Sequence, residues 1–466
     1  MRSPVVIQRT PSPARAGFVY LLALIVIVVV SSLAVVMARG AGLRLRAGQA
    51  DTARATCRVA ALGVLRAVAN DLGTSYATGA PHLLTVLPDG ERVGDCTVVL
   101  IGRDPSGVAQ RFDLIDEAGK ISVNCLIDPH GLPVPQPVKD GLFNAISALP
   151  GAPVDLAPTL KDWVDDDEVP DKNGGAERTD STYSGANVPY APRNAPIETV
   201  DELRLVHGVT DQLFFGEDAN SNGRLDPGED TNHDGKLTPG LRDLLTLESR
   251  DRANPPAGTP SFVNVRDRNG LRALFQKLFG QAREAELDAI LQPIPPSGIL
   301  SRLHLLVTLD LDDSEADTIW PYLSGPEGRL GLIDAWSCHE DVLTAAVGVT
   351  IAKSIIAARP TTRPSGPGWL TNALTAPEAA QVGVLLTSGS YQFSVDILAV
   401  RNDGSGWARL SAYIDCSAGS ALVVNVRALE TQGWPLPDAT PEMIRRNRTS
   451  SDVSGSLANF LTTGKH

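Results

Sequence analysis

The sequence predicts an α+β protein in which a long N-terminal helix packs on an antiparallel sheet, with a large, mainly helical domain inserted into that sheet. Three observations predict this fold class. An uncharged apolar run over 18–38 continues into apolar residues at helical spacing. Strand-like alternation appears near 96–128 and returns near 390–429. Between these two groups, residues 142–359 have mostly helical patterns separated by loops rich in Pro, Gly and Asp.

The apolar run from Phe18 to Ala38 holds 21 residues without a charge. A helix of that length spans roughly 30 Å, the thickness of a bilayer core. A short basic leader with Arg2, Arg9 and Arg15 precedes the run. Basic residues favour the cytoplasmic side, so the leader predicts that the bulk of the chain lies across the membrane, although three arginines also follow the run.

Gly17 stands before the apolar run rather than after it. An ordinary secretory signal is cleaved after its apolar segment, which is then lost. A cut after Gly17 would instead leave the apolar helix on the mature protein, beginning at Phe18. This arrangement resembles the type IV prepilin pattern, in which a dedicated prepilin peptidase cuts after Gly. The alternative is an uncleaved signal anchor.

The helical spacing of apolar residues continues to about Leu72, which predicts one helix with an apolar first half and an amphipathic second half. The amphipathic positions are Ala50, Ala53, Cys57, Ala60, Ala61, Val64, Leu65 and Val68.

Six segments are rich in β-branched residues or alternate between apolar and polar residues, as half-buried strands do. These segments are 96–104, 109–117, 121–128, 390–400, 407–416 and 421–429. Asn402-Asp403-Gly404 marks a hairpin between two of them. We expect these segments to form one antiparallel sheet, interrupted by the helical insertion, and the chain after 431 to be a loose tail.

The chain has 466 residues and a net charge of −13, which argues against non-specific nucleic-acid binding and suits a protein that binds cations. The cysteines show neither CxxC nor zinc-type spacing with histidine. They are Cys57, Cys96, Cys125, Cys338 and Cys416. In an oxidising compartment one or two disulfides are expected, and the odd count leaves at least one thiol unpaired.

The segment Asp218–Glu229, DANSNGRLDPGE, matches the twelve-residue calcium loop. Oxygen-bearing side chains occupy the ligand positions, Gly223 allows the sharp turn, and Glu229 is placed to bind through both oxygens. The expected ligands are Asp218, Asn220, Asn222, Arg224 through its carbonyl, Asp226 and Glu229. The alternative is an acidic, solvated loop without an ion.

A second array of oxygen-bearing residues, Asp230, Asn232 and Asp234, follows directly. Its twelfth position is Leu241, so it lacks the bidentate glutamate. Since no helix separates the two arrays, a true EF-hand pair is excluded, and a calcium loop of the extracellular Asp/Asn-rich kind is expected.

Asp162, Asp165, Asp166, Asp167 and Glu177 form a further acidic group around Trp163. Carboxylates this close repel one another unless a cation or a basic partner neutralises them. The string DWVDDD, the following GAE with Tyr183, and the block 191–209 are similar to the general secretion pathway protein K family, the minor pseudopilins of type II secretion systems. Leu22 agrees, because this family usually lacks the Glu found there in other pilins.

The resemblance implies a pilin-like fold and calcium bound with the help of Asp165, Asp167 and Glu177. It implies a single-pass inner-membrane protein, cleaved and methylated at its new N-terminus, with the bulk of the chain in the periplasm. Its expected place is the tip of the pseudopilus, where it supports protein export. A subunit at the tip has no subunit ahead of it, so it needs no Glu for pairing with one. The expected partners are the other minor pseudopilins, the major pseudopilin, the prepilin peptidase and the inner membrane, with no nucleic acid.

The expected organisation follows from these patterns and from the resemblance. It is a leader (1–17), a transmembrane helix (18–38), the periplasmic half of the helix (39–72), the first part of the sheet (73–140), an inserted domain with calcium loops and helix-hairpin-helix-like units (141–370), the C-terminal strands (371–430) and a flexible tail (431–466).

No histidine lies in an HExxH motif or beside a GxSxG motif, so we expect no enzyme. Two other classes remain open. A membrane-anchored calcium-dependent adhesin or binding module would use the apolar helix only as a tether. A periplasmic hydrolase would use Asp165 and Glu177 as an acid/base pair.

Overall fold

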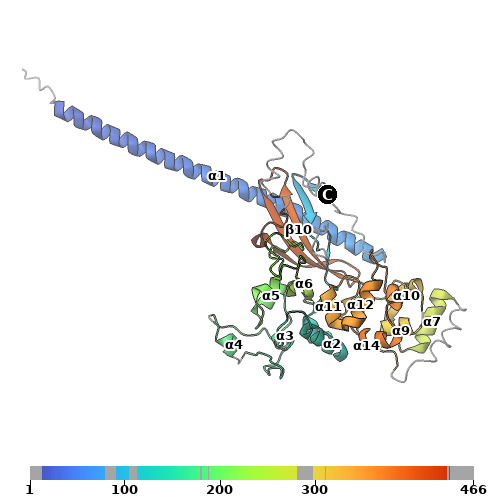
Figure 1. Cartoon of the computed structure of the whole chain (residues 1–466). Helices are drawn as coiled ribbons and strands as arrows, with labels where there is room; N and C mark the ends of the chain where they lie inside the picture. Colours follow the sequence, from blue (N-terminus) through green and yellow to red (C-terminus); the bar gives the residue numbers. More distant parts are fainter. Residues whose placement is uncertain are drawn as a thin grey trace, which may run out of the picture.

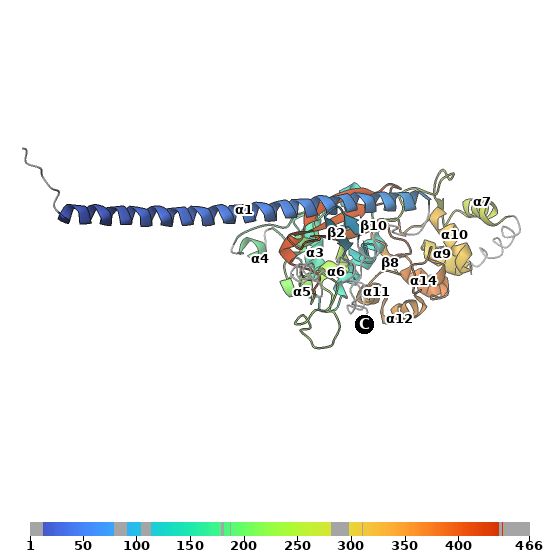
Figure 2. The same ribbon diagram turned by 90° about the horizontal axis from the view of Figure 1, so that it is seen from above.

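Helix α1 (Pro13–Thr78) extends far beyond the rest of the chain (Figures 1 and 2). The computed structural model describes residues 13–78, 91–103, 113–178, 181–186, 188–280, 298–309, 311–437 and 440, with side chains from Phe18 onward. The predicted Gly17–Phe18 boundary lies inside α1, which has 66 residues. The basic residues Arg2 and Arg9 lie outside the described residues.

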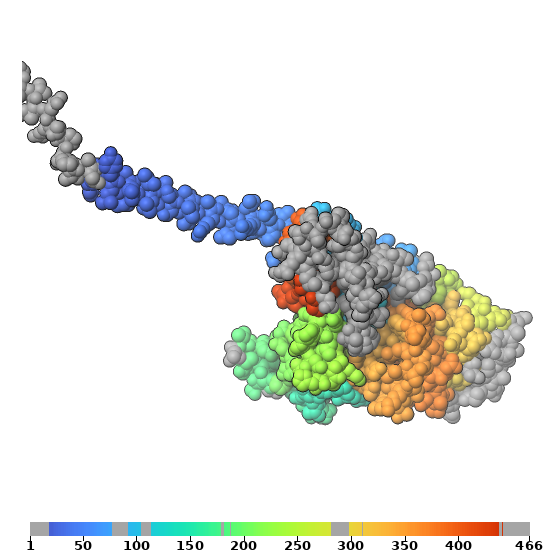
Figure 3. Space-filling model, turned by 45° about the horizontal axis from the view of Figure 1, so that its top comes forward, coloured from blue at the N-terminus to red at the C-terminus, as the bar shows by residue number. Residues whose placement is uncertain are grey.

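The first half of α1 is exposed (Figure 3). Among the described helices, α1 is the one long and apolar enough to cross a membrane. The first buried side chain is Ala53, and every third or fourth residue to Leu72 is then buried. Ala50 was predicted on this face but is exposed. Between the apolar run and Ala53, residues 39–52 are exposed except for the half-buried Gly40, and they include three glycines, none of which would meet another atom with an added Cβ.

One six-stranded antiparallel sheet has the order β1-β2-β10-β11-β12, and β3 also pairs with β10. The strands are β1 (Glu91–Val93), β2 (Cys96–Leu100), β3 (Ile115–Asp116), β10 (Gln392–Arg401), β11 (Trp407–Asp415) and β12 (Leu422–Ala428). Strands from both ends of the chain pair directly, since Leu398 on β10 faces Val99 on β2. The predicted α+β fold class, with a helical domain inserted into the sheet, is therefore confirmed.

The two faces of the sheet pack against different parts of the chain because side chains alternate along each strand. Phe393, Val395 and Ile397 on β10 share a core with α1. The neighbouring Leu398 packs on the opposite face with Leu436. The chain after 431 is thus not a loose tail throughout, because Leu436 is buried; residues after 440 lie outside the described part.

The segment 121–128 does not join the main sheet, contrary to the prediction. Residues 121–122 form β4 (Ile121–Ser122), which pairs in parallel with β5 (Leu245–Thr246), and a 3-10 turn follows at Asn124–Leu126. The buried Asn124 amide donates to the carbonyl of Ile197 at 3.0 Å and accepts from its N–H at 2.8 Å. This contact between residues far apart in sequence outweighs the local preference for a strand.

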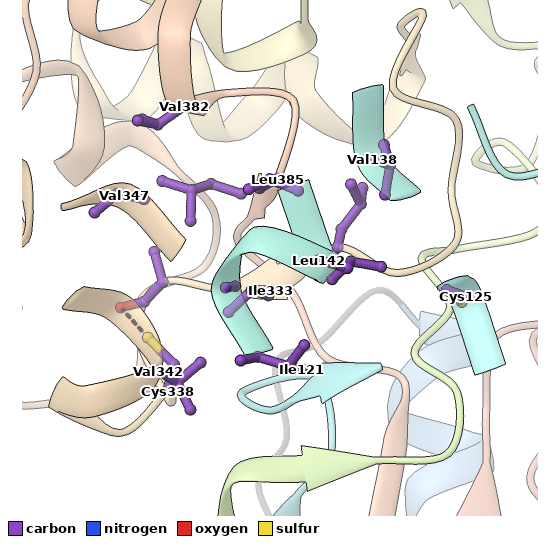
Figure 4. Packing of buried hydrophobic residues seen from close by; sticks show 14 of the residues in the cluster. Ile121, Cys125, Val138, Leu142, Ile333, Cys338, Val342, Val347, Val382 and Leu385 are labelled. Atoms are coloured by element: carbon purple, nitrogen blue, oxygen red, sulfur yellow. Dashed lines mark hydrogen bonds between the residues drawn. The ribbon is translucent and has the colours of Figure 1, made fainter. Parts of the chain in front are cut away.

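The inserted domain lies beside the sheet, away from α1 (Figure 2). Its core joins α2, β4, β8 and α11 through Leu142, Ile121, Ile333 and Val342 (Figure 4). The helices are α2 (Gln136–Ser147), α3 (Leu156–Val164), α4 (Ser181–Ser184), η3 (Val200–Leu205), α5 (Asp211–Phe215), α6 (Leu241–Leu244), α7 (Arg268–Phe279), α9 (Arg302–Thr308), α10 (Asp313–Ile319), α11 (Glu340–Val347), α12 (Val349–Ala358), α13 (Gly368–Thr371) and α14 (Ala376–Val382). Two parallel strand pairs complete the domain, β6 (Val263–Asn264) with β7 (Leu323–Ser324) and β8 (Ile333–Asp334) with β9 (Leu386–Thr387).

Candidate metal centre

Three carboxylates converge where α3 ends, and we call Asp162, Asp165 and Glu177 the acidic cluster. One oxygen from each lies within 4.8 Å of the other two. Asp162 lies in the last turn of α3 and Asp165 directly follows it, so the spacing of three places both on one side of the helix end. Asp162 and Glu177 are fully buried.

The loop between Asp165 and Glu177 folds tightly back onto α3. The N–H of Asp171 lies 3.1 Å from both carboxylate oxygens of Asp162. A Cβ at Gly175 would lie 1.9 Å from Oδ2 of Asp162, so only glycine fits there. The GAE sequence therefore has a geometric role, because the small residue lets Glu177 approach Asp162.

Several buried oxygens at this site have no hydrogen-bond partner. They are Oδ1 of Asp165, Oε1 of Glu177 and Oδ1 of Asn194. Asn194 lies beside Glu177, and its N–H donates to the carbonyl of Trp163 at 3.0 Å. Leaving such groups unpaired is costly, and together they form an all-oxygen donor set of the kind that hard cations prefer.

The electrostatics of the acidic cluster also favour a cation. Burial, together with the charges of Asp167 and Asp162, raises the pKa of Asp165 to about 7. Burial likewise raises the pKa of Asp162 and of Glu177. A divalent cation would remove the repulsion that causes part of these shifts, and the residues present fit a calcium-type ion.

The structure places the predicted ligands of this group differently from one another. It brings Asp165 and Glu177 together but leaves Asp167 outside the acidic cluster, where Asp167 Oδ1 accepts from the N–H of Val169 at 2.7 Å. Asp162 takes its place and is absent from the predicted ligand set. The signal for Asp162 lay in the sequence itself, because this residue begins the acidic string DWVDDD.

Aromatic side chains pack against one another next to the acidic cluster. Tyr183 is fully buried, and its ring centroid lies 5.6 Å from that of Trp163 and 5.3 Å from that of Tyr190. Nε1 of Trp163 donates to Glu202 at 3.0 Å. Trp163 and Tyr183, which carried part of the sequence resemblance, therefore hold the end of α3 in place.

The predicted calcium loop, Asp218–Glu229, is closed by its own carboxylates. Asp218 accepts from the N–H groups of Asn222 and Gly223, each at 2.9 Å, and Gly223 has φ +71°. Glu229 accepts from the N–H of Ala219 at 3.1 Å and of Asp226 at 2.9 Å. Oδ1 of the buried Asp226 has no hydrogen-bond partner.

The carboxylates of this loop do not reach the spacing of the acidic cluster. Within the residues described, the acidic cluster is the group in which three such oxygens all lie within 4.8 Å. Binding of one ion by all three carboxylates of the loop would therefore require them to come closer together.

Two arginines hold the loop 218–229 against its surroundings. Arg409 on β11 is fully buried, and its guanidinium donates to the carbonyls of Asn220 and Ser221, both at 2.7 Å. The same guanidinium pairs with Asp396 on β10 at 2.5 Å. Arg242 lies 3.5 Å from the Asp218 carboxylate. The loop thus joins the inserted domain to the face of the sheet opposite α1.

The second array is closed by Glu217, a residue that the sequence reasoning missed. The N–H groups of Thr231 and Thr238 donate to the two oxygens of Glu217 at 2.8 and 3.0 Å. Ala219 and Asp226 hold the same places in the first loop, second and ninth, and donate to Glu229. Glu217 therefore makes the hydrogen bonds in the second array that Glu229 makes in the first loop and that Leu241, at the twelfth position, cannot make.

The ionisation of Glu217 fits this role. Burial acts to raise its pKa, but the hydrogen bonds from Thr231 and Thr238 lower the pKa of Glu217 to about 2. Asp230, Asn232 and Asp234 remain mostly at the surface, and Asp230 and Asn232 accept from the N–H groups of Gly235 and Asp234. No local motif could reveal Glu217, because it precedes the first loop rather than ending the second.

Comparisons with known proteins agree with the sequence resemblance. Residues 119–215 match the family model described as type II secretion system (T2SS), protein K. Type II secretion system protein K of Klebsiella pneumoniae is 32% identical over 83 residues, 18% of this chain and 24% of the relative. The chain thus spans about a quarter of the length of the curated relative that it matches.

A solved structure gives a looser similarity. It is the crystal structure of the GspK-GspI-GspJ complex from the type 2 secretion system of enterotoxigenic Escherichia coli, with 16% identity and a TM-score of 0.39. The similarity covers 83% of this chain and 99% of that one.

Proposed function

We propose that this chain belongs to the type II secretion system protein K family, which its residues 119–215 match, and that it is a minor pseudopilin that supports protein export across the outer membrane. The observation that carries the proposal is the matched domain itself, which contains the acidic cluster and is inserted between strands of the sheet. The exposed apolar half of α1 supports the same conclusion, since a pilin-type subunit assembles through such a helix.

The proposed position is the tip of the pseudopilus. Leu22 leaves the exposed apolar half of α1 without a carboxylate, and a buried, unpaired carboxylate would be a large cost for a subunit with none ahead of it. The inserted domain gives the chain a bulky head (Figure 3), which would obstruct the addition of another subunit. The partners proposed on this basis are the other minor pseudopilins and the major pseudopilin.

Processing tests the proposed membrane insertion. In this proposal a prepilin peptidase cuts after Gly17, the new N-terminus is methylated, and α1 then holds the protein in the inner membrane with its head in the periplasm. Mass spectrometry of the protein isolated from membranes is expected to find the chain starting at Phe18. An uncleaved leader would instead favour the membrane-tethered adhesin. No contact among the described residues specifically supports that alternative.

Calcium is the proposed cofactor at three places. The acidic cluster would hold one ion through Asp162, Asp165 and Glu177, with Asn194 near by. The first loop would hold another through Asp218, Asn220, Asn222, the carbonyl of Arg224, Asp226 and Glu229. The second loop would use Asp230, Asn232 and Asp234 with Glu217. Bound calcium supplies no reaction step here and stabilises the folded head by mass action.

We assign the acidic cluster to cation binding rather than to acid–base catalysis. Three carboxylates with unpaired buried oxygens are explained by one ion, and none of the three lines the neighbouring cleft formed by Trp163, Tyr190 and Glu202, where a hydrolase would need them. A hydrolytic activity that is lost in E177Q and unaffected by chelation would overturn this assignment.

Co-purification with candidate minor pseudopilins tests the proposed function as a whole. The head, freed of α1 residues before 48, is expected to form a soluble complex with at least one minor pseudopilin of the same secretion system. The full-length protein in detergent is the matching sample. If neither form binds any of them while both are folded by circular dichroism, the pseudopilin assignment fails.

A further inference from the structure

Two buried thiols from separate elements touch beneath α1. Sγ of Cys57, on the half of α1 that packs on the sheet, lies 3.6 Å from Sγ of Cys96, the first residue of β2. Both side chains are 0% exposed and belong to the core between α1 and the sheet. The sulfurs need to approach by only about 1.5 Å to reach the length of a disulfide, about 2.05 Å.

We propose that Cys57 and Cys96 form a disulfide that fastens α1 to the sheet when the chain folds in an oxidising compartment. The inference rests on the proposed function in one respect, since the proposed periplasmic location supplies the oxidant. Both S–H bonds break and one S–S bond forms. Two protons and two electrons pass to a disulfide-bonded thiol oxidoreductase, which leaves as a dithiol.

The geometry selects this pair from the five cysteines, all of which lie in the described residues. Cys57 and Cys96 are the pair in sulfur contact. Sγ of Cys338 instead lies 3.6 Å from the carbonyl of Ala335. Cys416 is buried in the same core as Cys57 but provides no second sulfur contact there, so it is a natural control.

Burial determines when the bond can form. It raises the pKa of Cys57, with Cys96 adding to the effect, so closure of the core lowers the thiolate fraction at that position. Because the thiolate is the attacking species, oxidation is favoured before the core closes. The bond would therefore form during folding and then be shielded from reductants.

The bond would have a mechanical consequence. Cys57 lies close to Ala53, where α1 first meets the sheet. A disulfide at this point would stop the helix from being peeled away from the sheet when the exposed part of α1 is pulled. It would also close the chain between 57 and 96 into a covalent loop.

Thiol trapping tests the pairing in the full-length protein. Membranes are treated with an alkylating reagent under denaturing conditions without reductant, and the purified chain is digested and analysed by mass spectrometry. The expected result is one linked pair of peptides containing Cys57 and Cys96, with Cys125, Cys338 and Cys416 alkylated. Alkylation of both Cys57 and Cys96, in a chain that begins at Phe18 with a protease-accessible periplasmic head, overturns the proposal and leaves the proposed function intact.

If the chain is instead unprocessed and its head cytoplasmic, the proposed function fails and a refolding experiment decides the pairing. Denatured, reduced protein is refolded in a buffer of reduced and oxidised glutathione. Selective formation of the Cys57–Cys96 bond supports the geometry, and its absence or random pairing overturns it. In the oxidised protein, dithiothreitol present during thermal unfolding is expected to lower the melting temperature of wild type and of C416S equally. It should leave that of the C57S/C96S double variant unchanged, and an equal shift in all three would also refute the bond.

Discussion

Replacing Asp165 by asparagine is expected to have opposite effects on stability with and without calcium. In the metal-free protein, the variant removes a carboxylate whose ionisation the fold opposes. Burial, with Asp167 and Asp162, raises the pKa of Asp165 from 3.8 to about 7. The folded state thus binds this proton more tightly than the unfolded state, and metal-free wild type is expected to lose stability as the pH rises from about 4 to about 7.

The size of the effect follows from the same shift. A difference of about 3 pKa units corresponds to about 4 kcal/mol above pH 7, at about 1.4 kcal/mol per unit. Because Asp165 is only partly buried, solvent screening reduces this to about 2 kcal/mol. D165N in a chelator at about pH 8 should therefore raise the melting temperature by roughly 4–8 °C.

In calcium the sign should reverse. An ion that is present at about a hundredfold excess over its dissociation constant stabilises the wild type by about 2.7 kcal/mol, and D165N loses a ligand for it. Thermal unfolding followed by circular dichroism in EDTA and in calcium measures both arms. D166N is the matched control, because Asp166 is exposed and lies outside the acidic cluster, and it should show no reversal. If D165N shifts the melting temperature in the same direction under both conditions, the cation-site reasoning is refuted.

Three further predictions concern the elements around the cation sites. G175A should destabilise the head by about 1–3 kcal/mol in chemical unfolding and weaken calcium binding, because its Cβ collides with Asp162, whereas G63A on α1 meets nothing and should not. E217Q should remove one calcium from the stoichiometry measured by calorimetry if Glu217 closes the second loop, and an unchanged stoichiometry would contradict that role. R409M should cost about 3–5 kcal/mol in urea unfolding, because it leaves the buried Asp396 without its partner, and R409M/D396L should recover part of that loss.

The parts of the fold that the sequence predicted are those with strong local periodicity. The N-terminal helix and the strands near 392–428 follow spacings that a single segment contains. The turn at Gly223 in the loop 218–229 likewise follows from a local pattern and has the positive φ that the motif needs, whereas calcium binding there stays a prediction.

The parts that escaped prediction depend on contacts between distant residues. Residues 121–128 read as a strand, but the hydrogen bonds of Asn124 with Ile197 turn the chain away from the main sheet. Glu217 completes a loop that begins well after it, and nothing in its own neighbourhood indicates this. In both cases tertiary hydrogen bonds decided the outcome, and a one-dimensional pattern contains no record of them.

The exposed stretch of α1 over residues 39–52 makes the connection between the apolar segment and the head easy to bend. Its side chains are exposed, so mainly its own backbone hydrogen bonds keep it helical. Gly40, Gly42 and Gly48 weaken that helix by about 1 kcal/mol each relative to alanine. Over a length of about 20 Å, this joint can bend or unwind under load while the head stays folded. The head can therefore change its tilt relative to the membrane without moving the apolar segment.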